Sequence, residues 1–117
     1  MASYPIYQVN AFTNKTFGGN PAAVVPLDEW LPDEVMQNIA KEKKLSETAF
    51  FVKTDTGFHI RWFTPTNEVK ICGHATLATS WVIFNELGYE QDEIIFASLS
   101  GDLRIKKSKW LNNGFSK

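Results

Sequence analysis

The fold is decided by the stretch Gly73-His74-Ala75-Thr76-Leu77-Ala78-Thr79-Ser80-Trp81-Val82-Ile83-Phe84-Asn85-Glu86. Its spacing predicts a helix that runs from about Gly73 to Glu86 and stops at Gly88, a suitable C-cap. The apolar residues cover nearly the whole circumference of this helix: Ala75, Leu77, Ala78, Trp81, Val82, Ile83, Phe84 and Leu87. A helix that is apolar all round is buried all round, so we expect the rest of the chain to enclose it.

Short strand-like segments flank this helix on both sides. Apolar residues at a spacing near two, bounded by glycine and proline, predict strands at Pro5–Phe12, Pro21–Pro26, Thr48–Lys53, Phe58–Phe63, Glu68–Cys72, Ile94–Ser98 and Asp102–Lys106. Thr13–Asn20 is a predicted loop, and Pro32 opens a further helix. The economical architecture is an α+β fold, a curved mixed sheet wrapped around the buried helix. Periodicity alone is equally compatible with a helix packed on one open sheet.

Composition excludes several classes of protein. The chain has 117 residues, of which 44% are apolar and 21% charged, and this is typical of one globular domain. Its net charge of −1 provides no basic surface for nucleic acid. The single cysteine allows no internal disulfide and fits a reducing cytoplasm. With no signal-peptide pattern at its start and no apolar stretch long enough for a bilayer, the chain is expected to be cytoplasmic, with no membrane partner.

Glu47 is the first candidate for proton chemistry. It stands in Leu45-Ser46-Glu47-Thr48-Ala49-Phe50, where a predicted helix leads into an apolar strand. We expect its carboxylate to be half-buried, because its neighbours Leu45, Ala49 and Phe50 are apolar. Such burial would raise the carboxyl pKa toward the range of a general acid or base. A solvated glutamate at a helix end is the simpler interpretation, and spacing alone favours it.

The second candidate is the amino end of the buried helix, at Cys72-Gly73-His74. Free backbone N–H groups there suit a carboxylate, glycine allows close approach, and His74 can donate a hydrogen bond or pass a proton. A plain helix-opening turn explains Gly73 and His74 somewhat better on local sequence. Cys72 could be a nucleophile, a proton-transfer thiol or a small buried residue. Because Cys72 and His74 alone are too few and too close for a zinc site, no metal is expected.

Seven segments of the chain occur in one characteristic order. They are Asn10–Thr13, Phe17–Val25, Met36–Ala40, Leu45–Phe50, Arg61–Pro65, Glu68–Val69 and Cys72–Ala78. In this order they resemble the PhzF-like proteins, relatives of the phenazine-biosynthesis isomerase. The resemblance extends from about Tyr7 to Lys106.

The resemblance implies both a fold and an activity. The family has the diaminopimelate epimerase-like fold, in which each of two lobes is a barrel-like sheet around a central helix and the active site lies between the lobes. The implied reaction is a proton shift on a small unsaturated cyclic carboxylate, without metal or organic cofactor. Glu47 would be the acid/base, Gly73 and His74 would hold the substrate, and Ser46 and Asn20 would lie nearby.

Measured against this family, the chain corresponds to one lobe. We expect residues 1–110 to form an N-terminal lobe, residues 111–117 to be an aberrant tail, and the second lobe to be absent. After Trp110 the family tends to continue with a strand resembling Leu-Thr-Met-Asp-Phe-Pro. One codon choice for Leu111–Lys117 encodes that peptide once a single adenine is deleted, so a frameshift is one hypothesis. A deliberate boundary with an unrelated tail is the other.

Three functions remain open at this point. The first is one lobe of a PhzF-like isomerase that acts through Glu47. The second is a catalytically inactive lobe that binds a partner or a small acid, because a half-site lacks the opposing acid/base and admits water. The third is cysteine-based racemisation, since epimerases of the same fold have a catalytic cysteine near the position of Cys72. An exposed cleft face also predicts self-association into a homo-oligomer.

Overall fold

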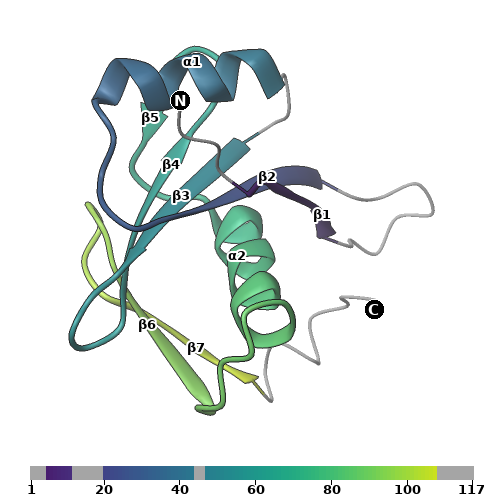
Figure 1. Cartoon of the computed structure of the whole chain (residues 1–117), viewed down its shortest axis with the longest axis vertical. Coiled ribbons are helices and arrows are strands. Elements are labelled where there is room, and N and C mark those ends of the chain that lie inside the picture. The colour runs from purple at the N-terminus through teal and green to yellow at the C-terminus, as the bar shows by residue number, and fades with distance from the viewer. Residues whose placement is uncertain (1–4, 12–19, 44–46, 108–117) are drawn as a thin grey trace.

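The computed structural model describes residues 5–11, 20–43 and 47–107, which form one curved mixed sheet and two helices (Figure 1). The strands are β1 Tyr7–Ala11, β2 Asn20–Leu27, β3 Glu47–Lys53, β4 Phe58–Phe63, β5 Glu68–Val69, β6 Glu93–Ala97 and β7 Leu103–Lys106. The helices are α1 Asp33–Lys43 and α2 Gly73–Asn85. The sheet has the order β1-β2-β3-β4-β6-β7, and β5 pairs with β4. This confirms the α+β class expected from the sequence.

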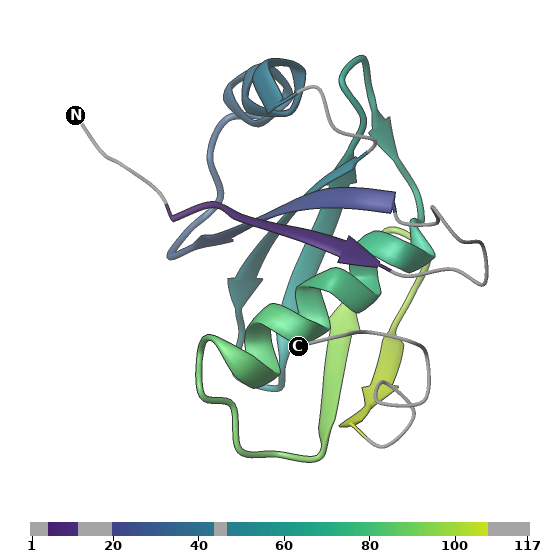
Figure 2. The same ribbon diagram turned by 90° about the vertical axis from the view of Figure 1, so that its right-hand side faces the viewer.

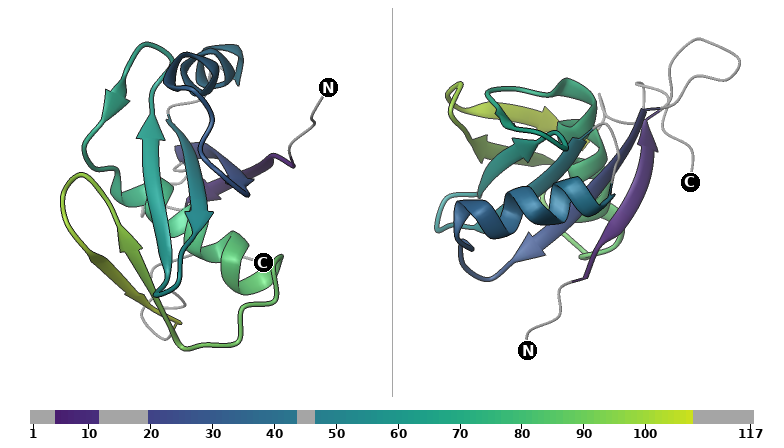
Figure 3. Two further views of the ribbon diagram at one scale, coloured as in Figure 1. Left: turned by 60° about the vertical axis from the view of Figure 1, so that its left-hand side comes forward. Right: turned by 90° about the horizontal axis from the view of Figure 1, so that it is seen from above.

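Two helical crossovers determine the strand directions. β2 and β3 pair in parallel, as do β4 and β6, whereas the other pairs are antiparallel. Parallel neighbours need a long connection across the sheet, which α1 supplies between β2 and β3 and α2 supplies between β4 and β6. The two helices lie on opposite faces of the sheet (Figure 3), so each face has its own core.

The larger core lies between α2 and the sheet. Alternate residues of β4 point into it, namely Phe58, Ile60 and Trp62, as strand geometry requires. The helix contributes Ala75, Ala78, Val82, Ile83 and Phe84. Full burial of a Val, Ile or Phe side chain stabilises the folded state by roughly 1.5–3 kcal/mol. The packing of α2 against the sheet is therefore a main source of this lobe's stability.

Three small polar side chains are also buried on α2. The hydroxyls of Thr76, Thr79 and Ser80 donate to the carbonyls of Cys72, Ala75 and Thr76, at 2.7, 2.8 and 2.8 Å. Because each hydroxyl has its partner within the helix, burial leaves none of them unsatisfied. The helix thus stays compatible with an apolar core although its sequence is not wholly apolar.

One side of α2 is less enclosed than the sequence predicts. Leu77 and Trp81 are only partly buried, and Leu87 just beyond the helix is 45% exposed. β1 and β7 are the two edges of the sheet, and no strand of the described residues crosses α2 between them (Figure 2). The sheet around a central helix is confirmed, but burial all round is wrong for this side, because the described sheet does not close.

Element boundaries differ from the predicted ones by a few residues. The helix expected to open at Pro32 begins at Asp33, and the carbonyl of Pro32 accepts hydrogen bonds from the amides of Val35 and Met36. β5 ends at Val69, short of the expected Cys72. Of the predicted loop Thr13–Asn20, residues 13–19 lie outside the described residues, as does the tail at 111–117, and Asn20 is the first residue of β2 and not part of a loop. Among the described residues, no helix has the length and apolar character needed to span a membrane.

Candidate acid/base site

Glu47 is the first residue of β3, not the end of a helix. Its parallel pairing with Ala22 of β2 fixes its position at one end of the strand. It alternates with Ala49 and Phe51, whose side chains belong to the core around α2, so its carboxylate points to the same face. The side chain is 17% exposed. The carboxylate is therefore partly buried, and the interpretation of a solvated residue at a helix end is wrong.

His74 meets this carboxylate from the first turn of α2. Its Nε2 lies 2.7 Å from Oε1 of Glu47, and its side chain is 24% exposed. Both atoms are themselves buried, and neither has a hydrogen-bond partner among the described residues, so their approach is a close polar contact without hydrogen-bond geometry. The two candidates that were predicted separately thus lie together, with the carboxylate from β3 and the imidazole from α2.

Cys72 completes a row of three polar groups. It precedes α2 in an extended conformation, with φ −151° and ψ 105°, and its Sγ lies 3.5 Å from Nδ1 of His74. Burial raises the pKa of this thiol to about 11; the amides of Ala75 and His74 lower it, and the neighbouring carboxylate of Glu47 raises it. The thiol therefore keeps its proton at neutral pH.

The protonation of Cys72 has a consequence for the neighbouring ring. A protonated thiol can donate to Nδ1 when the ring proton is on Nε2, or accept from Nδ1–H when it is not, so the tautomer decides the direction of this contact. The arrangement places the carboxylate of Glu47, the imidazole of His74 and the thiol of Cys72 in a row. Such a row can accept a proton from a bound molecule and return it.

The other predicted site residues are only partly accounted for. Gly73 is exposed, and a Cβ built on it would meet open space. It begins α2, where the first amides have no partner within the helix, as the anion-binding interpretation requires. Asn20 opens β2, but its side chain lies outside the described part of the chain, as does all of Ser46.

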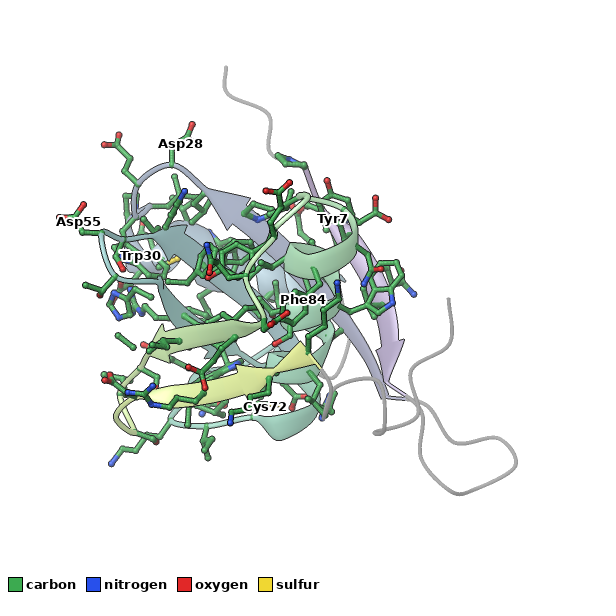
Figure 4. The ribbon with its side chains drawn as sticks, turned by 90° about the horizontal axis from the view of Figure 1, so that it is seen from below. Tyr7, Asp28, Trp30, Asp55, Cys72 and Phe84 are labelled. Atoms are coloured by element: carbon green, nitrogen blue, oxygen red, sulfur yellow. The ribbon has the colours of Figure 1, made fainter. Side chains whose placement is uncertain are left out.

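A groove of about 400 Å³ borders this end of α2. Its lining residues come from α2 and from the segment leading through β7: Ile71, Gly73, Thr76, Leu77, Asp102, Leu103, Arg104 and Ile105. Gly73 belongs to both the groove and the amino end of the helix, whereas Glu47 and His74 do not line the groove. Figure 4 labels Cys72 before the first turn of α2 and Phe84 in its last turn.

A second charged cluster lies on the opposite face of the sheet. Arg61 makes two hydrogen bonds to Glu68, at 2.7 and 2.8 Å, and one to Asp33 at 3.0 Å. Its guanidinium also stacks near the rings of Trp30 and Phe63. These carboxylates raise the pKa of Arg61 and neutralise its charge. The cluster connects β5 and α1 to β4. Because both carboxylates bind Arg61, its guanidinium is not free to bind an anionic substrate.

The fold is similar to that of epimerase-like α+β proteins. In structure it is similar to a predicted epimerase from Pseudomonas aeruginosa, with a TM-score of 0.76 over 87% of this chain and 37% of that chain. At 24% identity, this likeness shows the fold alone. Residues 9–114 match the family model for phenazine biosynthesis-like proteins. The chain belongs to this PhzC–PhzF family.

Two further relatives are more similar in sequence. A PhzF-family crystal structure from Enterococcus faecalis is 53% identical, with a TM-score of 0.85 over 91% of this chain and 41% of that chain. A protein of Pseudomonas aeruginosa named an uncharacterized isomerase is 53% identical over 102 residues, which are 87% of this chain and 39% of that protein. The chain thus spans about two-fifths of the length of these relatives.

Proposed function

We propose that this chain is the N-terminal lobe of an isomerase that shifts a proton on a small, cyclic carboxylate, with Glu47 as the acid/base. The observation that carries the proposal is the contact of 2.7 Å between Glu47 and His74 at the amino end of α2. Family membership and relatives named as isomerases support the general type of reaction.

The proposed mechanism uses groups from two elements. The substrate carboxylate binds the first amides of α2, at Gly73 and His74, which favour an anion. Glu47 takes a proton from one carbon of the substrate and returns it to another carbon, so the double bonds move and no electrons are gained or lost. A proton on Nε2 of His74, which lies 2.7 Å from Oε1 of Glu47, stabilises this carboxylate electrostatically before the transfer. Because one residue both removes and returns the proton, the step needs no organic cofactor.

The proposal also assigns a limit to the isolated chain. This lobe spans about two-fifths of its relatives, and the remaining part would supply the opposing wall of the site and further anion-binding groups. Without that wall, water enters and weakens the electrostatic stabilisation of a transition state. We therefore expect little or no isomerisation by the chain alone.

A chimera provides the direct test. Residues 9–107 replace the matching lobe of the Enterococcus faecalis relative, and a panel of cyclohexene and cyclohexadiene carboxylates is incubated with it in D₂O. Proton NMR should show deuterium entering one ring carbon. Glu47→Gln should slow this exchange by about 10²–10⁴-fold, the usual contribution of a general acid/base. Glu86→Gln, at an exposed residue beyond α2, is the matched control and should leave the rate unchanged.

The same experiment separates the competing mechanism. If Cys72→Ser abolishes exchange while Glu47→Gln leaves it intact, the chemistry belongs to the cysteine and the proposal is wrong. If no chimera exchanges any member of the panel while the unmodified relative does, the lobe is not catalytic. The groove beside α2 and the open sheet edges then favour the second candidate, a lobe that acts by binding.

A further inference from the structure

Glu47, Cys72 and His74 also have the composition of a metal site. One donor atom from each lies within 4.8 Å of the other two. The sequence argued against zinc because Cys72 and His74 alone provide too few groups. In the folded lobe a third group is present, since β3 brings the carboxylate of Glu47 next to Cys72 and His74. Thiolate, imidazole and carboxylate together favour Zn²⁺ and similar ions over Mg²⁺ or Ca²⁺, which prefer oxygen ligands alone.

The spacing of sulfur and nitrogen fits a single tetrahedral ion. Zinc binds sulfur at about 2.3 Å and imidazole nitrogen at about 2.0 Å, so two such ligands of one tetrahedral ion lie about 3.5 Å apart. Sγ of Cys72 and Nδ1 of His74 are 3.5 Å apart. The two atoms therefore need no change in separation to bind one ion.

The carboxylate of Glu47 lies beside Nε2, the other ring nitrogen of His74. Its Oε1 lies 2.7 Å from Nε2 of His74, so a metal ion bound to Nδ1 would leave the ring proton on Nε2, beside this carboxylate. A carboxylate in this position is the usual outer partner of a metal-binding histidine, where it orients the ring and raises its basicity. The structure thus supplies two ligands and the group that positions one of them.

We propose that Cys72 Sγ and His74 Nδ1 bind a thiophilic, tetrahedral divalent ion such as Zn²⁺, with Glu47 holding His74 in place through Nε2. As the metal–sulfur bond forms, the thiol releases its proton to solvent. Water or the carboxylate of a small acid fills the remaining positions. If Glu47 has the role given under the proposed function, the bound ion also inhibits the reaction, because it occupies the imidazole lone pair and displaces the thiol proton to solvent, so the row can no longer pass a proton.

Titration of the whole chain with Cd²⁺ tests the binding. We expect one equivalent to produce the ultraviolet charge-transfer band of a cadmium–thiolate bond, and Zn²⁺ in competition with a chromophoric chelator to bind with the same stoichiometry. Cys72→Ser should abolish the band and the binding, and His74→Ala should remove most of the affinity. Glu47→Gln should keep the band and weaken affinity about 10–100-fold, the usual effect of losing an outer partner.

His59 provides the matched control. It is the second histidine of the chain and packs against Trp30 on another part of the sheet, so His59→Ala should leave binding unchanged. Circular dichroism checks that each variant is folded. Zinc affinity that survives Cys72→Ser, or that is equal in the urea-unfolded chain, overturns the proposal. So does a Glu47→Gln variant with unaltered affinity. None of these outcomes touches the proton-shift proposal, which rests on deuterium exchange.

Discussion

At the scale of single residues, Cys72 shows how competing effects decide a protonation state. The amides of His74 and Ala75 lower the pKa of the thiol, while burial and the charge of Glu47 raise it, and burial has the largest effect. The outcome is a neutral thiol beside an imidazole. A thiolate would be the reactive nucleophile, so the neutral thiol of Cys72 is a weak one in the metal-free lobe.

This protonation state predicts slow alkylation. A pKa of about 11, against an ordinary value of 9.0, leaves about 100-fold less thiolate at pH 8, since each pKa unit is a factor of ten. Iodoacetamide should therefore modify Cys72 in the folded chain about 100-fold more slowly than in urea, as followed by mass spectrometry. Equal rates in the two states would show that the thiol is not buried as described.

The same shift gives a pH dependence of stability with a definite sign. The folded pKa lies above the unfolded one, so the neutral thiol stabilises the folded state fully below pH 9, and this contribution is lost as pH rises through about 11. Urea titrations at pH 8 and pH 10.5 should show a decline that Cys72→Ser reduces. An identical decline in both proteins would contradict the assignment.

Local sequence was sufficient to nominate these residues but not to bring them together. Glu47 and His74 were both predicted candidates, and each had a plainer interpretation that local spacing favoured. Their contact depends on the parallel pairing of β2 with β3 and on the position of α2 between β4 and β6, which are long-range features that periodicity does not encode. The undecided role of Cys72 had the same origin, because its partner atom belongs to His74 in a specific rotamer.

At the scale of elements, the turn before β4 shows how closely neighbouring strands approach. A Cβ built on Gly57 would collide with the backbone carbonyl of Ile95 in β6. Backbone atoms cannot give way as the end of a flexible side chain can. The strand prediction was accurate here, since alternation placed Phe58, Ile60 and Trp62 on the core face, but alternation says nothing about which strand lies alongside.

Substitution of glycines tests this approach. Gly57→Ala should destabilise the lobe by about 1–3 kcal/mol, the usual cost of forcing extra volume into a packed region, as measured by urea denaturation. Gly73→Ala is the matched control: its added methyl meets open space at the start of α2, so stability should change by less than about 0.5 kcal/mol. Equal effects at the two positions would contradict the described packing of β6.

At the scale of the whole molecule, the described part of the lobe is open on one side. β1 and β7 are unpaired edges among the described strands, and the groove between α2 and β7 has an apolar lining that includes Ile71, Leu103 and Ile105. The sequence predicted a helix surrounded by sheet, which holds except on this side. Nothing in the composition of α2 indicates it, because Leu77 and Trp81 are as apolar as the residues that are fully buried.

The open side predicts self-association of the chain. Unpaired strand edges and apolar grooves favour contact between copies, so sedimentation velocity should show oligomers that grow with concentration. Ile71→Lys, at a 56% exposed residue lining the groove, should shift the chain toward monomer. Leu99→Lys, at a 62% exposed residue that does not line the groove, should not. A monomer at all concentrations, or equal effects of both variants, would contradict this surface.

The two helical crossovers also determine when the site forms. Antiparallel neighbours such as β3 and β4, joined by the short turn at Thr54–Gly57, can pair early, because little chain entropy is lost in closing a short loop. Each parallel pair must wait until a whole helix has been placed across the sheet, and contacts between distant residues slow folding. Glu47 directly follows the crossover through α1, whereas His74 lies in the crossover through α2. They therefore meet late, and a newly synthesised chain carries its chemical groups unassembled until most of the sheet is in register.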